Sequence, residues 1–116
     1  MDWLGGQNMI QWTSRIYVSD NLKDKMDKIV DSINNGRLTY DIYCIAFASH
    51  PENLFDIINA NELLFPHYKK TDIKIAGLAR GREEALRLVQ DMIMEVYGHT
   101  GGFDVRGYFS SDYENR

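Results

Sequence analysis

The stretch from Thr71 to Phe109 constrains the fold most, because it predicts a strand, a helix and a second strand in succession. A strand is expected over Ile73–Ala79, since both of its alternating faces are mostly apolar. A helix is expected over Gly81–Tyr97, and a glycine turn then leads into a strand over Phe103–Phe109. This length suits a right-handed crossover between parallel neighbours.

Spacing within this stretch predicts which residues face the core. A regular pleat places Ile73, Ile75, Gly77 and Ala79 on one face of the first strand. The apolar residues of the helix recur at spacings of three and four, as expected for a helix packed on a sheet. Gly98 stands where a left-handed C-terminal cap is expected.

Two further strands and a helix are expected earlier in the chain. Ile16–Val18 is a short strand, and the apolar spacing between Leu22 and Ile33 predicts an amphipathic helix that ends at Asn35–Gly36. Leu38–Ala48 is nearly free of polar residues, so it is expected in the middle of the sheet.

The segment between these strands and Thr71 is harder to interpret. Ser49–Glu52 has the form of a capping box, and it predicts a short helix driven by apolar residues between Leu54 and Ile58. In Glu62–Lys70, Pro66 is expected to end any regular element, leaving apolar side chains to fill a gap at the sheet edge.

These elements predict one α/β domain with four strands and three helices in the order β-α-β-α-β-α-β. The sheet is expected to be mixed or mostly parallel. The alternative is a two-layer α+β sandwich with helices on one face, in which Ile16–Val18 and Phe103–Phe109 pair antiparallel. We assign residues 1–13 to an N-terminal arm, 14–110 to the domain and 111–116 to a polar tail.

Composition narrows the function classes. The chain has 116 residues and a formal net charge of −4, which disfavours general binding to a phosphate backbone. It has a single cysteine and no signal peptide, so we expect a cytoplasmic, bacterial protein. No apolar run is long enough for a membrane span.

One turn hints at ligand binding. Gly77, Arg80, Gly81 and Arg82 lie where a strand ends and a helix begins, the usual ligand position in open α/β sheets. Free N–H groups and two guanidinium groups there can hold a phosphate or carboxylate. The turn matches neither the dinucleotide fingerprint nor the Walker loop. The alternative is that the glycines serve close packing and the arginines pair with nearby carboxylates.

No catalytic, metal or cofactor site is predicted. The three histidines, His50, His67 and His99, lack ligand partners at metal-binding spacing. Cys44 lies in the expected central strand, where cysteine behaves as a small apolar residue.

Aromatic residues are plentiful and suggest an interaction surface. Trp3, Trp12, Phe65, Tyr68 and Tyr108 are its candidate residues. The preferred hypothesis is therefore a non-enzymatic accessory or regulatory protein that binds itself, as a homodimer, or another protein. The alternative is a small-anion binder or enzyme that uses the turn at Arg80–Arg82. A more distant hypothesis is nucleic-acid binding by basic residues that include Lys74 and Arg106.

Overall fold

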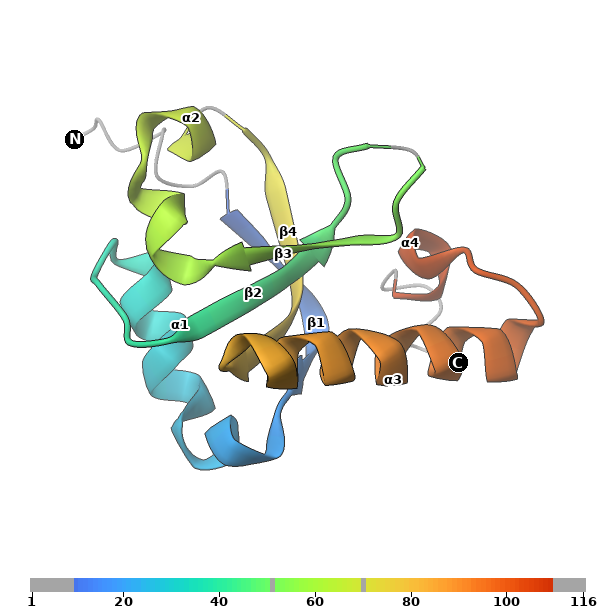
Figure 1. The fold of residues 1–116 in the computed structure, drawn as a ribbon. Coiled ribbons are helices and arrows are strands. Elements are labelled where there is room, and N and C mark those ends of the chain that lie inside the picture. Colours follow the sequence, from blue (N-terminus) through green and yellow to red (C-terminus); the bar gives the residue numbers. More distant parts are fainter. Residues whose placement is uncertain (1–9, 51, 70, 110–116) are drawn as a thin grey trace.

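A four-stranded mixed sheet forms the centre of the molecule, with helices on both faces (Figure 1). The computed structural model describes residues 10–50, 52–69 and 71–109. The strands are β1 (Ile10–Val18), β2 (Ile42–Phe47), β3 (Phe55–Asn59) and β4 (Ile73–Arg80). The helices of these residues are α1 (Met26–Asn34), α2 (Pro66–Lys69), α3 (Arg82–Thr100) and α4 (Val105–Tyr108), and the same residues contain the 3₁₀ helices η2 (Asp20–Lys25) and η3 (Ala60–Leu64).

The strand order is β1-β4-β2-β3, so β4 and β2 lie inside the sheet. β1 pairs parallel with β4, whereas β2 pairs antiparallel with both β4 and β3. The prediction of an α/β domain with a mixed sheet is thus confirmed, but the sheet is not mostly parallel, because two of its three strand pairs are antiparallel. The element order differs, because β2 and β3 follow each other as a hairpin. The described residues also form four helices, two of them long, where three were expected.

Each face of the sheet carries its own hydrophobic cluster. On what we call the α1 face, Ile29 and Ile33 of α1 pack with alternate residues of β2, such as Ile42 and Cys44. On the α3 face, Leu88, Met92 and other residues of α3 pack with Ile45 and with residues of β4. Helices on both faces make three layers, whereas the sandwich alternative has two.

A bulge in β4 changes the predicted faces of that strand. Ile45 of β2 pairs with Gly77 and the next residue, Ala46, pairs with Ile75, so β4 contains one extra residue at this point. As a result Ala79 joins the α3 face, and Leu78 joins the α1 face with Ile75. The regular pleat expected from the sequence was therefore wrong beyond this point.

The prediction of a strand followed by a helix over β4 and α3 is confirmed, but the helix extends further. α3 continues through Gly98 to Thr100 and ends at Gly101, whose φ is 75°. The left-handed cap is therefore three residues later than predicted.

The strand expected over Phe103–Phe109 is wrong, because these residues form the short helix α4. The Asp104 side chain accepts a hydrogen bond from the Gly107 N–H and caps this helix. Val105 and Phe109 are four residues apart, which is helical spacing, and both side chains are buried in the α3-face cluster.

The helix expected after Ser49 is also wrong, because Phe55–Asn59 is the strand β3. Ser49 does not cap a helix; its N–H and its hydroxyl instead donate to Asp56. β3 pairs along β2, and the Phe47 and Phe55 rings stack with centroids 5.8 Å apart. Long-range pairing thus decides the structure of a short apolar run that can form either element.

Smaller differences affect the element boundaries. β1 begins at Ile10, within the segment assigned as an arm, and the rest of that arm and the polar tail lie outside the described residues. Tyr40 precedes β2 and is 80% exposed. Pro66 begins α2, where a proline is tolerated because the first N–H of a helix has no partner, and so it does not end regular structure there.

Candidate functional site

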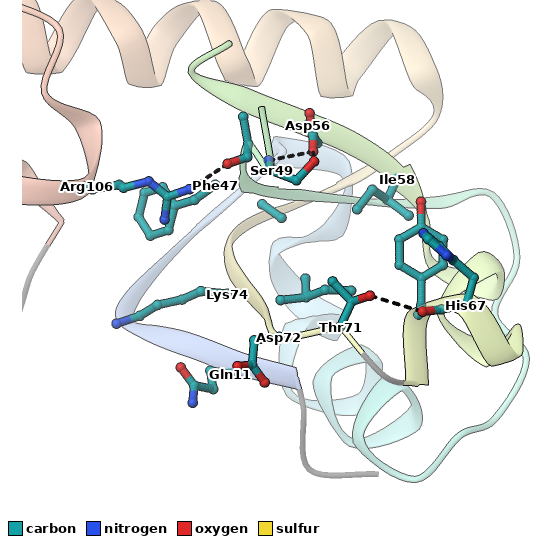
Figure 2. Close-up of a pocket in the computed structure, with 14 residues that line it drawn as sticks. Gln11, Phe47, Ser49, Asp56, Ile58, His67, Thr71, Asp72, Lys74 and Arg106 are labelled. Carbon is teal, nitrogen blue, oxygen red and sulfur yellow. Dashed lines mark hydrogen bonds between the residues drawn. The ribbon is translucent and has the colours of Figure 1, made fainter. Parts of the chain in front are cut away.

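The sheet forks at the end where β4 begins. The ladder between β2 and β4 ends at the pair Ala46–Ile75. Beyond it, β4 continues beside β1 as far as the pair Ile10–Ile73, while β2 continues beside β3 as far as Phe47–Phe55. A cleft of about 480 Å³ lies in this fork, and Figure 2 shows the side chains that line it.

The cleft has an apolar interior and a polar rim. Its apolar lining consists of Ala46, Phe47, Ala48, Ile58, Tyr68 and Ile73. Its polar lining consists of Gln11, Ser49, Asp56, His67, Thr71, Asp72, Lys74 and Arg106. Apolar walls together with polar groups that can orient a ligand are found in small-molecule sites.

The alternation of the strands places the charged groups on different faces. Lys74 lies between Ile73 and Ile75, which both belong to the α1-face cluster, so its side chain is on the α3 face. Asp56 lies between two residues that pack on the α3 face, so its side chain is on the α1 face. Because both residues line the same cleft, the cleft connects the two faces.

Arg106 is positioned from outside the sheet by α4. Its Nη2 donates to the Ala48 carbonyl at the end of β2, and its Cζ lies 5.2 Å from the centre of the Phe47 ring. These contacts hold the guanidinium plane and leave other N–H donors for a ligand. Neither Arg106 nor Lys74 forms an ion pair with any carboxylate in the described part of the chain.

Asp56 is half-buried and keeps one oxygen available. The N–H and the hydroxyl of Ser49 both donate to Oδ2, at 3.2 and 3.4 Å, and no described residue donates to Oδ1. His67 also lines the cleft, and its ring contacts Tyr68 edge-on. No hydrogen bond joins the His67 ring to Ser49 among the described residues.

A hydrogen-bond network on the α3 face fixes α4 and thus the backbone that carries Arg106. Glu95 of α3 accepts from Tyr17 of β1 and, at 2.8 Å, from Tyr108 of α4. Arg15 also contacts this carboxylate, at 3.3 Å. The network therefore joins three elements through one side chain.

The network shifts the pKa values of its members. Burial alone raises the pKa of Glu95, but the hydrogen bonds from Tyr17 and Tyr108 and the positive charge of Arg15 outweigh burial, and the net pKa is lowered. Burial and the neighbouring Glu95 raise the pKa of Tyr17, so its hydroxyl stays protonated and donates.

The predicted anion site lies at the opposite end of β4. Gly77 is buried in the sheet. Nη1 of Arg80 donates to the Tyr40 carbonyl at 2.9 Å, and the Gly81 N–H donates to the Asp41 carbonyl at 2.8 Å. Arg82 is exposed in the first turn of α3. None of these four residues lines the cleft.

The predicted aromatic residues lie on different parts of the molecule. Trp12 and Tyr68 pack on the α1 face, and the Trp12 Nε1 donates to Asn34 at 2.8 Å. Tyr108 packs on the α3 face, Phe65 is 56% exposed, and Trp3 lies outside the described residues. Of the four described residues of this set, Tyr68 alone lines the cleft.

The remaining sequence candidates have no shared site. Cys44 is buried on the α1 face, and burial raises the pKa of its thiol to about 12. Among residues 10–50, 52–69 and 71–109, no group of three or more histidine, cysteine or acidic side chains gathers around a metal position. His50, His67 and His99 lie in different segments, and the cleft takes in His67 alone of the three.

Sequence reasoning did not select the charged residues of the cleft as a site. Lys74 carried the clearest signal, because it is the one charge within the apolar run Ile73–Ala79. Asp56 and His67 gave no sign of the cleft, and Arg106 was singled out only among the basic residues of the nucleic-acid hypothesis. The meeting of these residues depends on β3 being a strand and on α4 replacing a strand.

No protein-family model matches the chain, and neither a curated protein nor a solved structure gives a match. No helix in the described part of the chain combines the length and apolar character that crossing a membrane requires.

Proposed function

We propose that this chain is a non-enzymatic binding protein for a small organic anion held in the cleft of the forked sheet. The observation that carries the proposal is the pair Lys74 and Arg106, which line one cleft and have no carboxylate partner in the described chain. A carboxylate or phosphate between them replaces water on both cations.

The geometry gives each group a role. The Arg106 guanidinium, held against Phe47, presents paired donors to a planar carboxylate, and Lys74 supplies a flexible point charge. The apolar part of the ligand packs on Ile58 and Ile73. A volume of about 480 Å³ falls within the range of small-molecule pockets.

Calorimetric titration with caproate and with hexyl phosphate tests this proposal. We expect Arg106→Ala and Lys74→Ala each to weaken binding by about tenfold, the effect of losing one charge-assisted hydrogen bond. Arg82→Ala is the matched control, because Arg82 is an exposed arginine far from the cleft. Loss of binding in Arg82→Ala with the cleft variants unaffected would place the anion at the turn after β4 and overturn the proposal.

A second candidate function is self-association through α3. Leu86, Ile93 and Tyr97 are seven and four residues apart, so they lie along one line of the helix. Leu86 and Tyr97 are exposed, and the Tyr97 ring stacks on Phe103 with centroids 5.2 Å apart. Exposed apolar lines of this kind are common at protein interfaces.

Sedimentation velocity tests this candidate. We expect the protein to dimerise and Leu86→Lys to shift it to monomer, while Arg87→Ala on the neighbouring charged side of α3 has no effect. A concentration-independent monomer removes this function and leaves the ligand proposal unaffected.

A further inference from the structure

We infer that the anion held in the cleft is the C-terminal carboxylate of a short, extended peptide, whose main chain pairs with a strand edge of the fork. This inference rests on the proposed function and names its ligand class. The fork supplies the three features that such a ligand needs, which are strand edges without a neighbour, two cations beside them and an apolar wall.

The facing edges of two strands have no neighbouring strand at the fork. In the described residues, Ile73 and Lys74 of β4 pair only with β1, and Phe47 of β2 pairs only with β3. The Ala48 N–H donates to the Leu54 carbonyl at 3.3 Å, on the β3 side. Neighbouring residues of a strand direct their main-chain groups to opposite sides, so those of Phe47 are directed into the fork.

A strand edge of this kind selects for extended main chain. The same alternation directs the main-chain groups of either Ile73 or Lys74 toward the fork. Peptides add to a sheet at such edges, because the N–H and C=O groups of the edge bond to those of another main chain. A fatty acid or an alkyl phosphate has no amide groups to pair in this way. The strand edges therefore favour a peptide over other organic anions.

The terminal carboxylate of the peptide is assigned to Lys74 and Arg106. Figure 2 shows these two side chains on the side of the cleft away from His67. The acidic lining residues Asp56 and Asp72 form no ion pair with either cation in the described chain. A terminal carboxylate is planar and accepts paired donors from a guanidinium, while the lysine adds a second positive charge.

The last side chain of the peptide is expected to be apolar. On the α1 face the lining of the cleft includes Ala46, Ile58, Tyr68 and Ile73, which pack in one hydrophobic cluster. Side chains of an extended peptide alternate between the two faces of a sheet, so one that points to the α1 face contacts this wall. The volume of about 480 Å³ is that of a small-molecule site, so the cleft suits a short peptide.

Calorimetric titration with matched probes tests the inference. The probes are the free acid of N-acetyl-alanyl-alanyl-leucine, its C-terminal amide, its analogue methylated on the leucine nitrogen, and caproate, which has no amide groups. We expect the free acid to bind at least about tenfold more tightly than caproate, because it adds main-chain hydrogen bonds. The amide is expected to bind at least about tenfold more weakly than the free acid, and the methylated analogue to bind about as weakly as caproate.

Variants of the two cations connect the peptide to the cleft. Lys74→Ala and Arg106→Ala should each weaken binding of the free acid by about tenfold and leave binding of the amide unchanged, because the amide carries no terminal charge. Arg82→Ala should leave both affinities unchanged, because Arg82 is exposed and does not line the cleft. Thermal unfolding of each variant checks that the fold is retained.

The outcomes separate this inference from the proposed function. If caproate binds and the free acid binds no more tightly, the peptide inference is wrong and the anion-binding function stands. If the amide binds as tightly as the free acid, the carboxylate is not recognised and the inference is overturned, while the caproate titration decides the proposed function. If no probe binds, both fail.

A longer peptide tests whether the ligand is short. We expect a peptide of about ten residues with the same three residues at its C-terminus to bind no more tightly than the tripeptide, because its additional residues lie outside the cleft. If it binds more than about tenfold more tightly, the ligand is the tail of another protein and the short-peptide inference is wrong.

Discussion

At the scale of single residues, Glu95 is the polar side chain that connects β1 and α4 to α3. It joins β1, α3 and α4 by accepting from Tyr17 and Tyr108 and by contacting Arg15. Glu95 contributes most to stability when it is ionised, because hydrogen bonds to a carboxylate are stronger than those to a neutral group. The network therefore stabilises the fold only where Glu95 carries its charge.

Replacing Glu95 by Gln should destabilise the protein at neutral pH by about 1–2 kcal/mol, because the two tyrosines then donate to a neutral amide. Since the pKa of Glu95 is lowered from its ordinary 4.5, its contribution is present above that pH and is lost as the pH falls through the folded-state pKa. Urea denaturation of the wild type and the variant at neutral pH and at about pH 3 measures the destabilisation and its loss on acidification. An unchanged difference between the two proteins at the lower pH would contradict this account.

Cleft residues show what sequence can and cannot reveal at this scale. Lys74 is visible as a charge in an apolar run, and its exposure could be anticipated. Arg106 reaches the cleft through the Ala48 carbonyl, 58 residues away in the chain. No local pattern encodes such a contact, because it depends on where α4 lies relative to β2.

At the scale of elements, long periodic segments were predictable and short ones were not. β4 and α3 follow from apolar spacing sustained over many residues. β3 and α4 are five and four residues long. In such lengths, helical and strand spacings overlap, and pairing with β2 or burial against α3 decides between them.

Two glycines in different elements should respond to alanine with opposite signs. Gly98 lies within α3 with no atom near an added Cβ, so Gly98→Ala should stabilise the protein by about 0.5–1 kcal/mol.

Gly77 in β4 is the contrasting case. An added Cβ there meets Ile45 Cδ1 and Met92 Sδ, each at 3.3 Å, and both side chains are fully buried. Gly77→Ala should therefore destabilise by about 1–3 kcal/mol. Urea denaturation of the two variants compares them directly, and changes of the same sign would show that the bulge is looser than described.

At the scale of the whole molecule, β4 is the strand on which the other parts depend. It pairs with β1 on one side and β2 on the other, and its residues enter both hydrophobic clusters. β3 lies at an edge of the sheet, beside the open cleft. At one end of the molecule β2 and β4 are hydrogen-bonded to each other, and at the other end, where the sheet forks, they are not.

Amide hydrogen exchange should follow this division. Residues of β4 that are buried on both sides are expected to exchange only by global unfolding, whereas β3 and α2 exchange through smaller openings. Exchange rates from NMR measure this order. If the amides of α2 were protected from exchange as strongly as that of the buried Leu78, the forked end would unfold together with the rest of the molecule, and this prediction would be wrong.

The position of β4 in the chain also has a consequence for synthesis. β1 and β2 leave the ribosome before their shared partner, which is complete only at Arg80. Until then the nascent chain can close the hairpin of β2 and β3, but β1 has no strand to join. Its apolar side chains stay without their native partner until β4 has been translated, so the native pairing of β1 forms late in synthesis.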